Sequence, residues 1–233
     1  VMAYVIGFMN IHIMISWRSH DQPIAFFPTF FWLGGVSCST LLFPYLTMFF
    51  NSWLSGLCNV LEGTFFYLLL PGITVIWAVA VGMACALLCR KRLYAGLLFI
   101  GVTLATYTLG IYRVLAEPPV FVYNPIIGYF PGPIYDEVVR ITQTLLIARS
   151  IDLVGVIALI TGLGLCIDPV TWKIQLPRLF SRYRWPEEAG RSMTRVVCLM
   201  ACLFLVAAYL YRAPLGLVID RDYIQQTLGG HRQ

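Results

Sequence analysis

Two oppositely charged residues stand three positions apart inside an otherwise apolar run of this sequence. The i, i+3 spacing of Arg149 and Asp152 places both side chains on one face of a helix, where each can neutralise the other. Ionisable groups at membrane depth are costly and mark ion or substrate pathways. Two interpretations stand: a buried polar site, or an ion pair at the membrane boundary. The second follows if the helix opens as early as Pro133, so that the membrane span is nearer 153–167.

A second group of polar candidates lies in the proline- and tyrosine-rich stretch 115–140. Asp136 and Glu137 follow a proline that predicts the first turn of a helix, where the helix dipole favours anions. Asn124 and Tyr129 are the candidate interaction residues ahead of them. Because prolines limit the unfolded chain and aromatic rings suit the headgroup level, we expect an ordered loop lying flat on the outer surface. It serves as a docking or substrate platform, or as an interfacial cap on the helices.

Cysteines form two i, i+4 pairs on predicted helices, Cys85/Cys89 and Cys198/Cys202. This spacing could ligate a metal or a haem. The alternative is that cysteine serves as a small apolar packing residue. No histidine accompanies either pair and the sequence has no CxxC motif, so we expect no metal site and no cofactor.

Catalytic signatures are absent from these 233 residues. The sequence contains no HExxH, GxSxG, GxxxxGK[ST] or GxGxxG pattern, so no catalytic residue is assigned and enzymatic activity is left open. The formal net charge is +5, but the excess is confined to two loops, which excludes nucleic acid as a partner.

Long apolar runs dominate the chain and must position these residues. Hydrophobic residues make up 59% and charged residues 12%, and the mean hydropathy is +0.79. A helix needs about 20 apolar residues to cross the hydrocarbon core, and only a helix satisfies its own backbone there. The pattern predicts an all-α, polytopic transmembrane helical bundle of about six membrane helices, counting the shorter segment 1–17. The five long runs are 24–50, 64–89, 94–116, 143–167 and 196–211.

Basic residues alternate between the connecting segments and predict the topology. Lys and Arg gather in three segments that we place in the cytoplasm by the positive-inside rule: 18–23, 90–92 and 168–195. The segments 51–63 and 115–140 fall on the far side. We divide the chain into a bundle over 1–211 and, over 212–233, the start of an extracytoplasmic tail that leads to a domain not included here.

Small residues and one proline predict how the helices pack. Pro71-Gly72 predicts a kink whose freed carbonyl needs a partner from a neighbouring helix. Five glycines in two of the runs offer surfaces for close helix approach: Gly101, Gly110, Gly155, Gly162 and Gly164.

Three stretches together carry a resemblance to a known family. They are Cys58–Gly63 leading into Leu68–Pro71, the long motif Tyr123–Glu137, and the ending Leu228–His231. The chain resembles the N-terminal membrane part of bacterial membrane proteins in which a gluzincin-like (peptidase MA-type) domain follows the helices. The resemblance implies a multi-pass protein of the bacterial inner membrane, and it supplies no zinc ligand within these residues.

Three functions are compatible with this sequence. The first is a membrane anchor and scaffold that presents an extracytoplasmic, peptidase-like domain. The second is a transporter or permease component that uses Arg149 and Asp152. The third is an accessory subunit of a membrane complex. The expected partners are the lipid bilayer and a second membrane protein or another copy of the chain.

Overall fold

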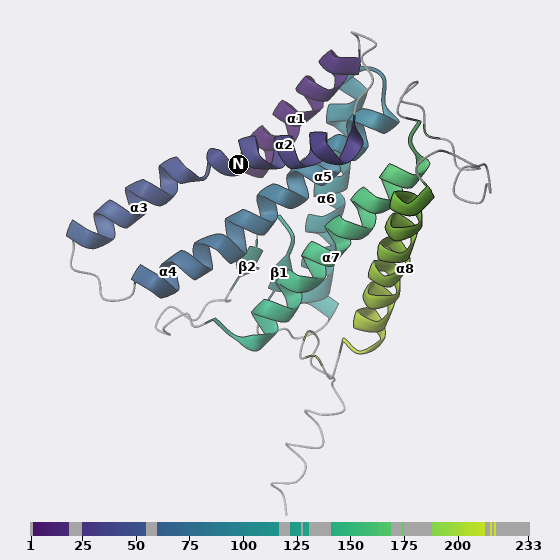
Figure 1. Cartoon of the computed structure of the whole chain (residues 1–233). Coiled ribbons are helices and arrows are strands. Elements are labelled where there is room, and N and C mark those ends of the chain that lie inside the picture. Colours follow the sequence, from purple (N-terminus) through teal and green to yellow (C-terminus); the bar gives the residue numbers. More distant parts are fainter. Residues whose placement is uncertain are drawn as a thin grey trace, which may run out of the picture.

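The computed structural model is built almost entirely of helices (Figure 1). It describes residues 2–18, 25–54, 60–116, 122–126, 128–130, 141–168, 174, 188–212, 215 and 217. The helices are α1 Met2–Arg18, α2 Phe26–Ser39, α3 Leu42–Leu54, α4 Val60–Tyr67, the π-helix η1 Leu68–Gly72, α5 Ile73–Leu88, α6 Arg92–Ala116, α7 Gln143–Cys166 and α8 Glu188–Leu210. Two short strands, β1 Val122–Asn124 and β2 Gly128–Phe130, pair as an antiparallel hairpin.

Five segments are long and apolar enough to cross a membrane. They are Phe26–Leu54, Val60–Leu88, Arg92–Tyr112, Gln143–Cys166 and Ser192–Leu210. The predicted all-α transmembrane bundle is therefore confirmed, with the hairpin as its one addition among the described residues. The sixth predicted span forms α1, whose 17 residues cover roughly 25 Å.

The first long run is two helices rather than one. A turn at Thr40 and Leu41 separates α2 from α3. Pro28 is the third residue of α2 and Pro44 the third residue of α3. Proline is tolerated in the first turn of a helix, where its missing N–H has no intrahelical partner, and is disfavoured further in. Pro44 is therefore a signal for the break that the hydropathy pattern conceals.

Helix α5 forms the centre of the structure. Twelve of its 16 residues are buried, and it contacts α1, α2, α6 and α7. A Cβ built on Gly82 would lie 3.1 Å from the carbonyl oxygen of Gly7, and one built on Gly7 would lie 2.2 Å from the ring of Phe99. Only glycine permits so close an approach of α1 to α5 and α6. We call α1, α2 and α5 the packed core.

The predicted deformation at Pro71 appears as the π-helix η1. Proline lacks an N–H and its ring collides with the carbonyl four residues earlier in an α-helix. A π-turn widens the helix locally, so the chain runs through Pro71 without ending. As a result α4, η1 and α5 make up the single span Val60–Leu88.

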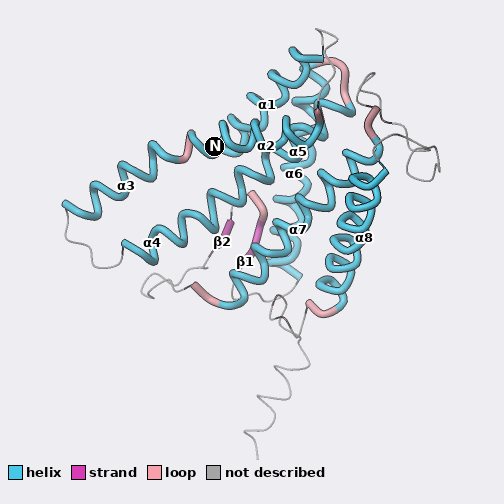
Figure 2. Tube along the Cα trace, in the orientation of Figure 1, coloured by secondary structure: helices cyan, strands magenta, loops and turns pink. Residues whose placement is uncertain are grey.

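Helices α3 and α4 extend sideways from the other helices (Figures 1 and 2). Neither contains a buried residue. Their junction with the packed core is held by Tyr67, whose hydroxyl donates to the carbonyl oxygen of Leu41 at 2.8 Å. We call this pair the α3–α4 wing.

The helix ends lie at the two ends of the bundle as the distribution of basic residues predicts. The ends of α1, α5 and α7 and the starts of α6 and α8 lie together in the upper part of Figure 1. The end of α6, the start of α7 and the end of α8 lie at the opposite end. Arg90 therefore lies at one end of the bundle, and the hairpin that contains Tyr129 lies away from it.

A buried ion pair beside a re-entrant hairpin

Arg149 and Asp152 form an ion pair on α7. The Arg149 Nη1 donates to the Asp152 Oδ2 at 2.7 Å. The Arg149 side chain is 1% exposed and that of Asp152 is 19% exposed. The expectation that each residue contacts the other is confirmed.

The start of α7 decides between the two interpretations of this pair. Thr142 has an extended backbone and its hydroxyl accepts from the Leu145 amide at 3.2 Å, which is an N-cap. The membrane helix therefore begins at Gln143, not at Pro133, because residues 141 and 142 are not helical. Arg149 lies six residues beyond Gln143, roughly 9 Å along a helix of about 36 Å. This position and its burial favour the buried polar site over the boundary.

Two donors of Arg149 lack an acceptor. Its Nε and Nη2 are buried and have no hydrogen-bond partner among the described residues. These two N–H groups leave the same edge of the planar guanidinium, which is the edge that binds a carboxylate or phosphate in bidentate fashion. A buried donor left unpaired costs about 1–3 kcal/mol. The ion pair is thus only partly satisfied by the residues that surround it.

The loop after α6 folds back against the helices. Asn124 is 5% exposed, its Nδ2 donates to the carbonyl oxygen of Thr106 at 3.1 Å, and its Oδ1 accepts from the Ile126 amide at 2.8 Å. The Thr74 hydroxyl donates to the carbonyl oxygen of Pro125 at 3.0 Å, and Thr74 lies half-way along the Val60–Leu88 span.

For residues 122–126 and 128–130, this hairpin corrects the expectation of a loop lying flat on the outer surface, and the rest of that loop lies mostly outside the described residues. Irregular backbone is tolerated at membrane depth where protein buries it and supplies hydrogen bonds, as Thr74 and Thr106 do here. Asn124 is accordingly a structural residue rather than an exposed interaction position.

The other candidates of the loop are placed only in part. The backbone of Tyr129 pairs with Tyr123 across the hairpin, and its side chain lies outside the described residues. Asp136 and Glu137 also lie outside them.

The hairpin and the ion-pair helix meet at the π-helix. Both β2 and α7 contact η1, and β1 contacts α6. The deformed turn of one span, a re-entrant hairpin and the helix of the buried arginine are therefore adjacent (Figure 2). We call η1, the hairpin and α7 together the polar centre. Here the chain departs most from simple helix packing.

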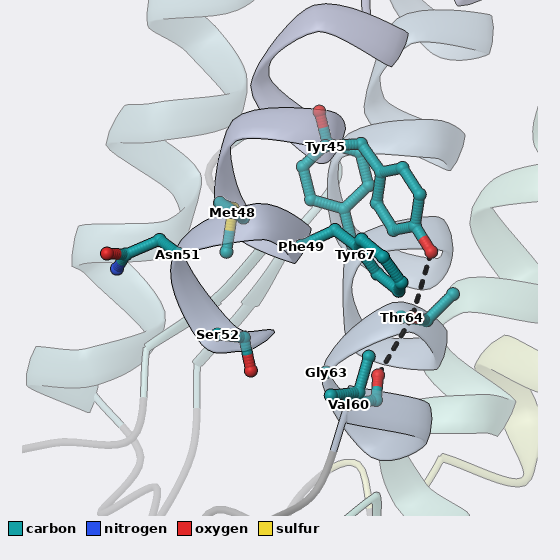
Figure 3. Close-up of a pocket in the computed structure, with 9 residues that line it drawn as sticks. All are labelled: Tyr45, Met48, Phe49, Asn51, Ser52, Val60, Gly63, Thr64 and Tyr67. Atoms are coloured by element: carbon teal, nitrogen blue, oxygen red, sulfur yellow. Dashed lines mark hydrogen bonds between the residues drawn. The ribbon is translucent and has the colours of Figure 1, made fainter. Parts of the chain in front are cut away.

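Two cavities lie apart from the ion pair. One of about 430 Å³ lies between α7 and α8 on the face that carries Leu146 and Ser150. The other, of about 250 Å³, lies in the α3–α4 wing between Phe49, Tyr45 and Tyr67 (Figure 3). Neither is lined by Arg149 or Asp152.

The described cysteines are all free thiols. The Cys198 Sγ lies 4.0 Å from the carbonyl oxygen of Ala158, so this cysteine packs between α8 and α7. Among the described residues no group of three His, Cys, Asp or Glu side chains is placed to hold a metal ion.

Sequence reasoning missed a polar contact inside the packed core. Asn10 is fully buried on α1, and its Nδ2 donates to the carbonyl oxygen of Ile6 at 2.9 Å and to the Ser37 hydroxyl of α2 at 3.3 Å. Its Oδ1 has no hydrogen-bond partner in the part of the chain that the structure describes. The available signal was one amide within the apolar segment 1–17, since polar side chains in such segments face other helices.

The fold and these sites define a class, the all-α multi-pass membrane proteins. No protein family, curated protein or solved structure matches the chain.

Proposed function

We propose that the chain is an integral membrane anchor and scaffold that presents an extracytoplasmic domain beyond Gln233. The observation that carries this proposal is the central position of α5. Its twelve buried residues contact four other helices, so this part of the bundle forms a rigid support. The buried ion pair lines neither described cavity.

The attached domain and the membrane are inferred from the sequence. The resemblance of the motif Tyr123–Glu137 supports a peptidase-like domain and the bacterial inner membrane. The clustering of basic residues next to the ends of α5 and α7 supports a cytoplasmic location for that end of the bundle. The end of α8 then faces the outside.

Reporter fusions test the orientation on which this function depends. Alkaline phosphatase, which is active only outside the cytoplasm, should be active when fused after Gln233. Green fluorescent protein should fluoresce when fused after Lys91, at the opposite end. Active phosphatase after Lys91 and an inactive fusion after Gln233 would overturn the proposal.

A replacement experiment tests the scaffold role itself. In the full-length protein, the bundle is exchanged for an unrelated single-span anchor with the same orientation. A scaffold predicts that the outer domain stays attached to the membrane but loses its in vivo activity. Full activity on the substitute anchor would contradict the scaffold role, because it would show that the bundle is not needed to position the outer domain.

The unpaired edge of Arg149 favours a second candidate, a transporter of small anions. The Nε and Nη2 donors match a carboxylate, and Arg149→Lys would remove this bidentate edge while keeping the charge. Uptake of a small carboxylate into proteoliposomes, lost in folded Arg149→Lys protein, would support transport. No uptake by the unaltered protein would leave the scaffold as the function.

The α3–α4 wing favours a third candidate, an accessory subunit of a membrane complex. Two helices without a buried residue expose large side chains such as Phe43 and Trp53. Crosslinking from Trp53, replaced by a photoreactive residue, should capture a membrane protein if the wing is an interface. Capture of lipid alone would exclude this role.

A further inference from the structure

Three cations occupy one connection between helices at one end of the bundle. Arg90, Lys91 and Arg92 occupy the tight connection between α5 and α6, and all three are exposed. The segment 73–116, which comprises both helices, contains no Asp or Glu. The three charges are therefore not neutralised by the elements that carry them.

A fourth cation adjoins this connection from α1. Arg18 ends α1, outside the five candidate spans, and its Nη1 lies 3.5 Å from the carbonyl oxygens of Ala86 and Leu87 near the end of α5. Burial, and after it the charge of Arg90, lowers the pKa of Arg18. The positive charges of Arg18 and Arg90 are therefore close together. Helix α1 itself contains no Asp or Glu. We call Arg18 and residues 90–92 the basic corner.

An exposed aliphatic face leads away from the basic corner along α6. Leu93, Leu97 and Leu104 are exposed large side chains on this membrane-spanning helix. A Cβ built on Gly101 would meet nothing within 4 Å, so the face is open between Leu97 and Leu104. The Lys91 ammonium lies 5.9 Å from the ring centre of Tyr94, an arrangement suited to headgroup level.

We propose that the basic corner binds the phosphate of an anionic phospholipid whose acyl chains lie along the Leu93–Leu104 face of α6. Charge complementarity selects the headgroup, because clusters of Lys and Arg at the end of membrane helices attract anionic lipids. The adjoining leucines select a lipid over a soluble phosphate, since only a lipid covers both surfaces. The inference goes beyond the scaffold role and does not depend on it.

Lipid binding is measured on the purified full chain in nanodiscs of phosphatidylcholine containing a minor share of phosphatidylglycerol. Retention of each lipid is then read by native mass spectrometry. The unaltered chain should retain phosphatidylglycerol preferentially. Removal of each cation should weaken this retention roughly fivefold, and the triple variant R90A/K91A/R92A should lose the preference.

The matched control is Arg212→Ala. Arg212 also stacks on a tyrosine, with its guanidinium 5.1 Å from the Tyr209 ring centre, but it lies at the opposite end of the bundle. Its loss should leave phosphatidylglycerol retention unchanged. The charge-conserving variant R90K/R92K should bind like the unaltered chain and confirms that the corner still folds.

Three outcomes would overturn the proposal. The triple variant could retain phosphatidylglycerol as well as the unaltered chain, or Arg212→Ala could lose as much as the triple variant. Inorganic phosphate could displace the lipid completely, which would assign the corner to a soluble anion. Gly101→Leu provides an independent check, because it fills the open part of the face and should weaken lipid retention without altering any charge.

Discussion

The packed core and the α3–α4 wing are both apolar, yet they pack in opposite ways. Twelve of the 16 residues of α5 are buried, whereas α3 and α4 contain none. Helix α5 is rich in Ala, Gly and Val, and α3 carries Phe43, Phe49, Phe50 and Trp53. Lipid chains are as apolar as leucine, so hydrophobicity alone does not drive helices together. Small side chains, which let backbones approach, distinguish the core from the wing.

The largest loss of stability is expected when a buried charge on α7 loses its partner. Asp152→Ala leaves the buried Arg149 without its ion-pair partner among the described residues and should lower the free energy of unfolding by about 3–5 kcal/mol. The double variant Arg149→Leu/Asp152→Ala should recover most of this loss. Unfolding in mixed detergent micelles measures both. Equal stability of the single variant and the unaltered protein would place the pair outside the packed region.

Gly7→Ala tests close packing directly. The new Cβ would collide with the ring of Phe99, which is fully buried against the rings of Tyr4 and Phe8, so a loss of about 1–3 kcal/mol is expected. Gly35→Ala is the matched control, because Gly35 is exposed on α2 with nothing within 4 Å. That change should be neutral or slightly stabilising, since alanine favours helix more than glycine does. Equal melting temperatures of the two variants would contradict the comparison.

Asn10→Ala probes the polar contact within the packed core. It removes the bond to Ser37 and should cost about 0.6–1.7 kcal/mol, the range for hydrogen bonds between membrane helices. Ser37→Ala should cost less, because Asn10 keeps its bond to the Ile6 carbonyl. A double-mutant cycle isolates the coupling between the two side chains. An additive cycle would mean that α1 and α2 are held by packing alone.

The smallest effect is expected in the α3–α4 wing. Tyr45→Phe removes the 3.2 Å contact between the Tyr45 and Thr64 hydroxyls and should change the unfolding free energy by no more than about 0.6 kcal/mol. Its consequence should be local, with faster hydrogen exchange over 42–54 and 60–67 and no change in α5. Slower exchange in the wing than in α5, already in the unaltered protein, would reverse the comparison.

Hydropathy predicted the membrane spans to within a few residues, but it could not predict their partners. Of the five glycines expected at helix contacts, Gly110 lies near Asn124, Gly162 near Cys198 and Gly164 near Phe27, whereas Gly101 and Gly155 meet nothing within 4 Å. The closest approach uses Gly7 and Gly82 instead. A glycine permits contact but does not specify it, because the opposite surface comes from a distant part of the chain.

The sequence predicts the ion pair of the polar centre but not the hairpin that lies in the same region. The i, i+3 spacing of Arg149 and Asp152 is a local property, and their contact follows from helix geometry. The return of the hairpin to Thr74 and Thr106 depends on two other spans, and no local pattern encodes it. The apolar run 143–167 matched α7, and Thr142 was the local signal that could have decided against the alternative in which this helix opens at Pro133.

The π-turn at Leu68–Gly72 also sets the direction in which the side chains point along the span Val60–Leu88. A π-turn accommodates one residue more than an α-turn, so the side chains after it are rotated by about 100° relative to those before it. Deleting one residue here would let the turn relax into an α-helix and rotate every side chain of α5 away from its present neighbour. The glycine that faces α1 would then point elsewhere, and a change of a single residue in length would turn the central helix by about 100° against its neighbours.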